Sequence, residues 1–203
     1  MRFGIVIPYR KRSEHLAQTA PVLSRFGKVF VIEQADDKPF NRGKLINVGY
    51  LTYSKYFDYF AAHDVDMLPE KVNYSYSENP CHLATEVEDY GYKLPNEKYF
   101  GGVTLFPNDK FEKVNGFSNN FWGWGGEDDY IRRRFEEMNI DLQSRQCRFK
   151  SLHHIRNIDQ DLRLKNKEIL RGDIRWEDGL TSCNFDVVGI TYNDKYVLLK
   201  VKL

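Results

Sequence analysis

The chain has few cysteines and no excess of charge of either sign. Its three cysteines, Cys81, Cys147 and Cys183, are odd in number and lack the spacing of a metal site, which favours reduced thiols in a cytoplasm over a disulfide framework. The 30 lysines and arginines nearly balance the 29 aspartates and glutamates, so no overall field favours a nucleic-acid partner. Long apolar runs are absent as well, which excludes a transmembrane segment.

Apolar runs alternate with polar, helix-compatible segments along the chain. We expect strands at residues 2–7, 28–33, 59–62 and 99–105, helices at 13–26 and 44–56, and a C-terminal hairpin formed by 186–190 and 196–201. Pro21 is a candidate break in the first helix, the second helix is expected to be amphipathic, and residues 71–95 show no firm periodicity. With 203 residues, the sequence predicts one α/β domain spanning 1–203.

A loop made only of glycine and tryptophan, residues 122–126, leads directly into Glu127, Asp128 and Asp129. Glycine permits positive φ and close approach of the backbone to a ligand, and indole rings offer flat apolar surfaces suited to sugar rings. The acids open a helix with apolar periodicity, where the positive end of the helix dipole favours negative charge. Stabilisation of the helix start is the ordinary interpretation of such acids, but the aromatic loop before them favours a ligand site.

Two aspartates, Asp64 and Asp66, follow the short apolar run at 59–62. They fall at the C-terminal end of a predicted buried strand, where open α/β sheets bind ligands. Alternation along the chain puts them on one side, where they could share a magnesium or manganese ion bound to a nucleotide diphosphate. His153 and His154 are further candidates, because a mixed carboxylate and imidazole set suits manganese. A solvated turn and an ordinary histidine pair are the alternatives.

Two basic segments lie near the N-terminus, at residues 8–12 and 39–44. Arg10 follows the first predicted strand, again at its C-terminal end. A guanidinium group there could pair with phosphate oxygens in a fork. Taken alone this signal is weak, because surface arginines commonly have no such role.

Together, in their order along the chain, these clusters resemble the β-1,4-galactosyltransferases, which are metal-dependent inverting glycosyltransferases. The matching segments are 7–16 (IPYRKRSEHL), 40–50 (FNRGKLINVGY), 63–66 (HDVD), 99–103 (YFGGV), 115–129 (NGFSNNFWGWGGEDD) and 178–180 (DGL). The string WGWGGEDD is highly specific to this family. The resemblance implies a GT-A fold with a mixed central sheet flanked by helices, a UDP-sugar bound with manganese or magnesium, and a single displacement that inverts the anomeric carbon.

The resemblance also assigns roles to matched positions. Asp128 corresponds to the general base, and Glu127 to a sugar-contacting acid beside it. Asp66 and His154 correspond to metal ligands. The remaining positions are the acceptor contacts Asp129 and Gly126 and the donor and nucleotide contacts Pro8, Arg10, Arg12, Phe40, Arg42, Asp64, Val65, Tyr99 and Trp124.

Tyr99 stands at the position where a tyrosine accompanies galactose transfer in the family. A phenol ring beside the C2 substituent leaves little space for an acetamido group, so the expected donor is UDP-galactose and the alternative is UDP-N-acetylgalactosamine. The chain departs from the family pattern at Ser151, where many animal members have a methionine ligand. It also departs at the adjacent His153 and His154, which the histidine-rich branch separates by one residue. The segment 159–167 does not match, so the resemblance does not specify the saccharide or glycolipid acceptor.

Two other function classes remain open. A non-catalytic sugar-binding module would keep the aromatic loop but need neither base nor metal. A metal-dependent phosphohydrolase could use Asp64, Asp66 and His154 but would not need the tryptophan loop.

The first apolar run follows Met1 almost at once, which leaves no room for the anchor and stem of the Golgi-anchored animal members. We therefore expect a cytoplasmic bacterial or viral enzyme. A basic region, 145–175, is compatible with peripheral membrane contact through lipid phosphate, with an anionic acceptor, or with a solvated face.

Overall fold

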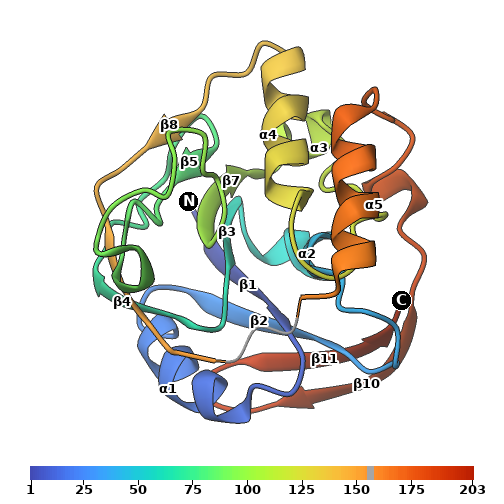
Figure 1. Cartoon of the computed structure of the whole chain (residues 1–203). Coiled ribbons are helices and arrows are strands. Elements are labelled where there is room, and N and C mark those ends of the chain that lie inside the picture. The colour runs from blue at the N-terminus through green and yellow to red at the C-terminus, as the bar shows by residue number, and fades with distance from the viewer. Residues whose placement is uncertain (155–157) are drawn as a thin grey trace.

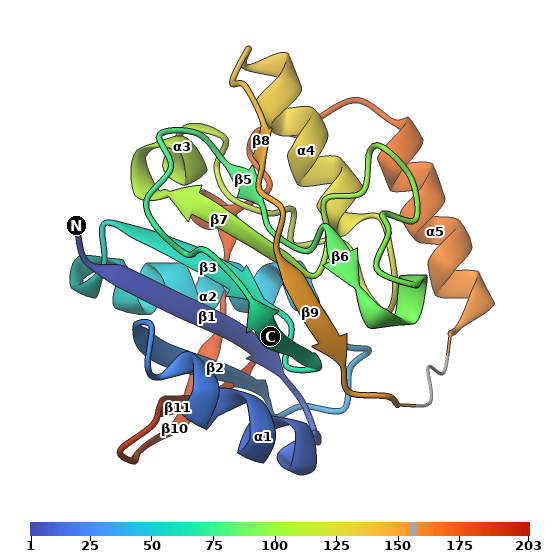
Figure 2. The same cartoon turned by 90° about the vertical axis from the view of Figure 1, so that its left-hand side faces the viewer.

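The chain folds around a mixed sheet flanked by helices, as predicted, and this sheet has eight strands in the described residues (Figures 1 and 2). The computed structural model describes residues 1–154 and 158–203. The strand order is β10, β11, β2, β1, β3, β7, β5, β8, and neighbours from β11 to β3 run parallel, whereas β7 and β10 are antiparallel to β3 and β11. The strands are β1 (Phe3–Tyr9), β2 (Lys28–Gln34), β3 (Tyr59–His63), β5 (Cys81–His82), β7 (Val103–Pro107), β8 (Gln143–Ser144), β10 (Asp186–Tyr192) and β11 (Val197–Lys202).

A second sheet of three strands, in the order β4, β9, β6, lies beside the first (Figure 2). Its strands are β4 (Met67–Lys71), β6 (Glu86–Val87) and β9 (Arg148–Ser151). The helices are α1 (Ser13–Leu23), α2 (Arg42–Tyr53), α3 (Asn108–Lys113), α4 (Glu127–Glu137) and α5 (Gln160–Arg171), with 3-10 turns at Ser54–Tyr56, Glu88–Tyr90 and Leu180–Ser182. α4 and α5 lie side by side (Figures 1 and 2).

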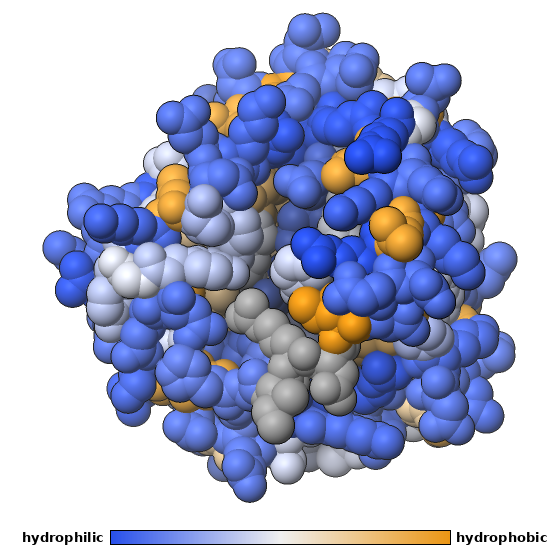
Figure 3. Space-filling model, in the orientation of Figure 1, coloured by the Kyte–Doolittle hydropathy of each residue, from blue (hydrophilic) through white to orange (hydrophobic). Residues whose placement is uncertain are grey.

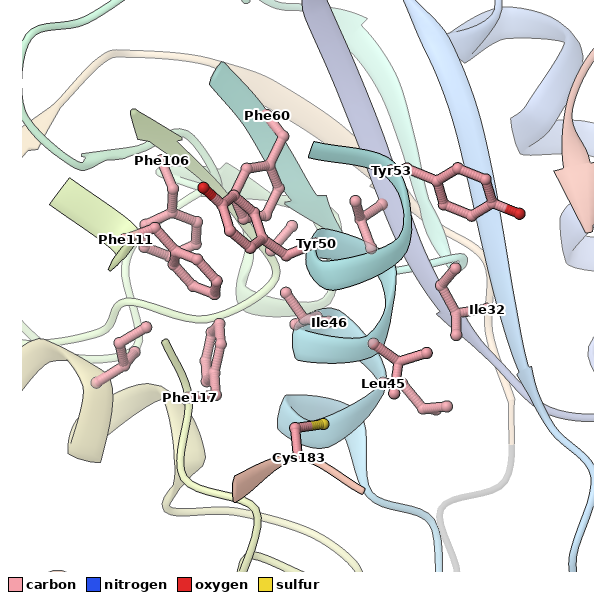
Figure 4. Close-up of a cluster of buried hydrophobic side chains, with 14 of the residues drawn as sticks. Ile32, Leu45, Ile46, Tyr50, Tyr53, Phe60, Phe106, Phe111, Phe117 and Cys183 are labelled. Carbon is pink, nitrogen blue, oxygen red and sulfur yellow. The ribbon is translucent and has the colours of Figure 1, made fainter. Parts of the chain in front are cut away.

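Two apolar cores lie on opposite faces of the main sheet, because successive side chains of a strand point to opposite sides. Ile5 and Ile7 of β1 belong to the core under α1, whereas Val6 belongs to the core under α2. Figure 4 shows the second core, in which aromatic side chains from β3, β7 and α3 surround Ile46 and Tyr50 of α2. The cores fix the carboxyl ends of β1, β2 and β3 at one edge of the sheet.

α2 is enclosed on most of its surface, which corrects the expectation of an amphipathic helix. It packs on the sheet on one side and against Phe117 on another (Figure 4). A Cβ atom at Gly49 would lie 2.5 Å from Val6 Cγ1, so the helix approaches β1 at a distance only glycine permits. The helix begins at Arg42 rather than at residue 44, because the Asn41 side chain accepts from Lys44 N at 2.9 Å and caps it.

Asn47→Ala is expected to reduce the free energy of unfolding by about 2–4 kcal/mol, because it leaves buried backbone groups unpaired. Asn47 is fully buried; its Nδ2 donates to the Phe117 carbonyl at 2.7 Å and its Oδ1 accepts from Phe117 N at 2.9 Å. Thr52→Ala on the same helix removes only a half-buried bond to the Val48 carbonyl and should cost less than about 1 kcal/mol. Urea unfolding of both variants measures the difference, and equal losses would contradict this role of Asn47.

Several predicted boundaries were wrong for identifiable reasons. α1 runs through Pro21 and ends two residues later, at Leu23 rather than at residue 26, so the proline does not divide it. The strand expected at 99–105 begins only at Val103, since Gly102 adopts a φ of 76°. Residues 71–95 contribute β5, β6 and a helical turn, each too short to show a period. β4, β9 and α5 were not predicted.

The surface in Figure 3 is mainly hydrophilic, with hydrophobic residues scattered over it. Within the described ranges, no helix combines the length and the apolar character needed to cross a bilayer. Part of the basic region 145–175, residues 155–157, lies outside the described residues.

Candidate active site

Residues far apart in the sequence meet at the carboxyl ends of β2 and β3. Arg42 opens α2, Asp64 follows β3, and Glu127 and Asp128 open α4. Arg42 Nε donates to Asp64 Oδ1 at 2.6 Å, and Arg42 Nη1 donates to Asp128 Oδ1 at 2.7 Å. Glu127 Oε1 lies 3.8 Å from the same Nη1, and only 11% of the arginine side chain is exposed. The predicted acidic and basic clusters are therefore joined around one guanidinium.

Burial controls the protonation of this cluster. It raises the pKa of Asp128 well above the ordinary aspartate value and also raises the pKa of Glu127, with Arg42 as the main opposing influence on both. Burial likewise raises the pKa of Asp129, opposed by Arg132. Burial alone would lower the pKa of Arg42, but the surrounding carboxylates raise it, so the guanidinium stays charged. A carboxylate with a raised pKa is a stronger base than an ordinary aspartate.

The loop at residues 99–102 packs against the acids. A Cβ atom at Gly101 would lie 2.7 Å from Asp128 Oδ2 and 3.2 Å from the Tyr99 hydroxyl oxygen, so both groups approach the same backbone position. His82 supports this loop, because its ring lies edge-on to Tyr99 with centroids 5.3 Å apart and its Nε2 donates to the Gly101 carbonyl at 2.9 Å. Burial lowers the pKa of His82 to about 4, so it is neutral at pH 7.

The glycine and tryptophan loop has the backbone that its composition predicts. Positive φ angles of 76°, 95° and 100° occur at Gly123, Gly125 and Gly126. Trp124 is 47% exposed and lies beside the Arg163 guanidinium of α5, 5.4 Å from the ring centroid. Asn166 of the same helix donates to the Trp122 carbonyl at 3.0 Å. α5, which was not predicted, therefore supports the loop.

Asp66 and His154 lie together, with Asp66 Oδ2 3.2 Å from His154 Nδ1 and 17% of the histidine side chain exposed. His153 instead faces Asp89, 3.0 Å away, and is 77% exposed, so the structure distinguishes the adjacent histidines. Ser151 Oγ accepts from Asp89 N at 3.1 Å. In the part of the chain that the structure describes, no three His, Cys, Asp or Glu side chains form a ready metal cluster.

Arg10 and Phe40, two predicted nucleotide contacts, lie against each other beside the start of α2. The Arg10 guanidinium is 5.3 Å from the Phe40 ring centroid, and its Nη1 donates to the Lys38 carbonyl at 2.6 Å. This places a cation and an aromatic face together at the sheet edge.

Pro8, Arg12 and Val65 occupy backbone positions next to this edge. Pro8 is buried in β1 opposite Ile32, and Arg12 is the N-cap residue of α1. Val65 is buried and its carbonyl accepts from Thr19 Oγ1 at 2.8 Å. The sheet and α1 thus hold these three positions near Asp64, and their donor contacts stay a prediction.

Asp178, matched in the sequence but given no role, anchors the segment that leads into the tryptophan loop. Its buried carboxylate accepts from Ser118 Oγ and, at 2.9 Å, from Asn119 N. A Cβ at the next residue, Gly179, would lie 1.9 Å from the Asn115 carbonyl oxygen. The match of 178–180 therefore reflects a structural requirement of the site.

His15 was also missed. It lies on α1, and its ring centroid is 5.9 Å from that of His154. Its buried Nδ1 has no hydrogen-bond partner within the described residues. The sequence offered one signal for His15, its place in the matched segment 7–16. That segment does not indicate that His15 lies beside His154.

Comparisons with known proteins agree with this arrangement. Residues 1–79 match the N-terminal region of glycosyl transferase group 7, and residues 81–158 match the N-terminal domain of galactosyltransferase. Beta-1,4-galactosyltransferase 4 of Homo sapiens is 39% identical over 98% of this chain, and beta-1,4-galactosyltransferase 1 of Homo sapiens is 34% identical over all of this chain. The chain spans 63% and 55% of those two relatives.

The fold is shared with solved structures. The catalytic domain of Drosophila beta1,4-galactosyltransferase 7, in complex with xylobiose, has a TM-score of 0.87 at 29% identity, covering all of this chain and 94% of that one. A mutant of that enzyme, in complex with manganese, UDP-Gal and xylobiose, has a TM-score of 0.84 at 26% identity over the same shares of the two chains. These matches confirm the predicted GT-A fold, and the two family models together with the identity over nearly the whole chain show that the chain belongs to the galactosyltransferase family of glycosyl transferase group 7.

Proposed function

We propose that this chain transfers galactose from UDP-galactose to a saccharide hydroxyl, with inversion at the anomeric carbon, to form a β-linked glycan. The observation that carries the proposal is the meeting of Asp64, Asp128 and Tyr99 at one sheet edge, with the tryptophan loop directly before Glu127 and Asp128 in the chain. The family membership and the UDP-Gal and xylobiose bound by the Drosophila relative support it. A cytoplasmic setting with peripheral membrane contact is part of the same proposal.

Asp128 is the proposed general base. The acceptor oxygen attacks the anomeric carbon, the bond from that carbon to the UDP oxygen breaks, UDP leaves with the bonding pair, and Asp128 takes the hydroxyl proton. Glu127 and Asp129 flank it and would contact the sugars. Trp124 would cover the donor and exclude water, which suppresses hydrolysis.

Asp66 and His154 would hold the divalent cation. Their carboxylate oxygen and imidazole nitrogen lie 3.2 Å apart, and this donor pair fits manganese better than magnesium, which prefers oxygen ligands. A bound cation would stabilise the charge that develops on the leaving diphosphate. The manganese complex of the Drosophila relative supports the assignment.

Tyr99→Leu is expected to increase the use of UDP-N-acetylgalactosamine relative to UDP-galactose, because removing the phenol opens space beside the donor C2 substituent. The hydroxyl of Tyr99 approaches the same backbone position, Gly101, as Asp128 Oδ2 does, which supports a role for the phenol in the proposed site. Rates with the two donors at matched concentration measure the preference.

Tyr90→Leu is the matched control for Tyr99→Leu, because it removes the ring that packs on Tyr99, with centroids 5.8 Å apart, and leaves the Tyr99 phenol in place. It should lower stability without altering donor preference. A wild-type preference for UDP-N-acetylgalactosamine, or equal shifts in both variants, would overturn the assignment of Tyr99.

A sugar-binding module and a phosphohydrolase are separated from a transferase by release of UDP. Acceptor-stimulated release indicates a transferase, equal release with and without acceptor indicates a hydrolase, and no release indicates a binding module.

A further inference from the structure

Arg42 contacts two acids at the same time: Asp64, a predicted nucleotide contact, and Asp128, the proposed base. Its Nε bonds Asp64 and its Nη1 bonds Asp128, both through the Oδ1 atoms. The other oxygen of the base, Asp128 Oδ2, is the one that approaches Gly101 beside the Tyr99 hydroxyl. One oxygen of the base is thus held by the arginine while the second faces the Tyr99 side of the site.

The position of Arg42 is fixed by buried contacts of the preceding residue. Asn41 is fully buried, its Oδ1 accepts from Lys44 N at 2.9 Å, and its Nδ2 donates to the Asn119 carbonyl at 2.8 Å. Asn119 lies in the segment that leads through the tryptophan loop to Asp128. The start of α2 and the start of α4 are therefore tied to one scaffold.

We propose that Arg42 is a positioning residue for proton transfer, which bridges Asp128 to Asp64 and leaves Asp128 Oδ2 to accept the proton of the acceptor hydroxyl. This inference rests on the proposed function and goes beyond a nucleotide contact for Arg42. A planar guanidinium can hold two carboxylates in a fixed geometry, whereas a lysine ammonium is a single point charge on a flexible stem.

The charges around the base support this role. Asp128 is faced by Arg42 from α2, by Asp64 after β3, by Glu127 and Asp129 of α4, and by the Tyr99 phenol. Burial and the neighbouring acids raise the pKa of Asp128, and Arg42 is the main group that lowers it. Burial raises the pKa of Tyr99, so the phenol stays neutral and does not replace the positive charge.

Arg42→Gln should therefore lower kcat and shift its acid limb. Without the arginine the pKa of Asp128 rises further, the base is protonated up to a higher pH, and the acid limb of the kcat profile moves upward by about one pH unit or more. We expect kcat to fall about 10- to 100-fold, at or below the lower end of the roughly 100- to 10,000-fold that general-base catalysis contributes, because the base itself is still present. Arg42→Lys keeps the charge but not the bridge, and should lower kcat about tenfold with a smaller shift of the acid limb.

Lys113→Gln is the matched control, because it removes an exposed positive charge in the last turn of α3, outside the proposed site. Its kcat and acid limb should equal those of the wild type. The assay uses UDP-galactose, manganese and the saccharide that gives the fastest transfer. If Arg42→Gln fails to fold by circular dichroism, Arg42→Lys decides the question through kcat.

A double variant tests whether Arg42 acts through the base. If it does, Arg42→Gln combined with Asp128→Asn should have the same kcat as Asp128→Asn alone. A rise in donor KM with kcat and acid limb unchanged in both Arg42 variants would reduce Arg42 to a nucleotide contact and overturn the inference, while loss in Asp128→Asn would keep the proposed function intact. Absence of acceptor-dependent transfer in the wild type would instead contradict the proposed function.

Discussion

Asp128→Asn is expected to reduce kcat by about 100-fold or more while donor binding is largely retained, because asparagine keeps the size of the side chain but cannot accept the hydroxyl proton. Burial raises the pKa of Asp128, so the wild-type kcat should fall as the pH drops through that raised pKa. The acid limb should disappear in the variant. Initial rates across pH, together with UDP-galactose binding by calorimetry, measure both effects.

Glu137→Gln is the matched control for this variant, because it removes an exposed acid at the opposite end of α4. It should keep wild-type turnover and the wild-type pH profile. Unchanged turnover in Asp128→Asn would remove Asp128 from the role of base, and Glu127 would then be the next acid to test.

Asp66→Ala and His154→Ala should each lose manganese-dependent activity by about 100-fold or more, since a bound cation contributes several kcal/mol to stabilising a leaving diphosphate. The direct readout is binding of Mn²⁺ itself, followed by the electron paramagnetic resonance signal of the free ion. Both variants should bind manganese more weakly than the wild type while their circular dichroism spectra stay unchanged.

His153→Ala provides the contrast, because this neighbouring histidine is exposed and faces Asp89 instead of Asp66. It should bind manganese as the wild type does. The assignment of Asp66 and His154 fails if Asp66→Ala turns over normally at low manganese, or if the loss of affinity follows His153 rather than His154.

Local structure that depends on neighbouring residues was predictable from the sequence. The glycine and tryptophan loop needs its positive φ angles and its following acids at adjacent positions, so composition alone indicated both the backbone and the helix start at Glu127. The parallel strands before Arg10 and Asp64 were equally visible as short apolar runs. Their carboxyl ends then had to meet at one edge of the sheet.

Partnerships across the fold were not predictable from spacing. Nothing along the chain indicates that Arg42 bonds Asp64 and Asp128, or that His15 lies beside His154. The period of α2 was misread because apolar groups cover both its faces, which removes the polar stripe that marks an amphipathic helix. α5 was missed because its surface is largely exposed and charged, although Asp159 caps its first turn.

The central claim is transfer of galactose, and release of UDP from UDP-galactose in the presence of Mn²⁺ tests it most directly. The rate is measured without acceptor and with a panel of saccharides that includes xylobiose, the saccharide bound by the Drosophila relative. We predict that at least one saccharide accelerates release and yields a β-linked galactoside, and that Asp128→Asn abolishes the acceleration. Release that is equal with and without every saccharide, or no release at all, would contradict the account.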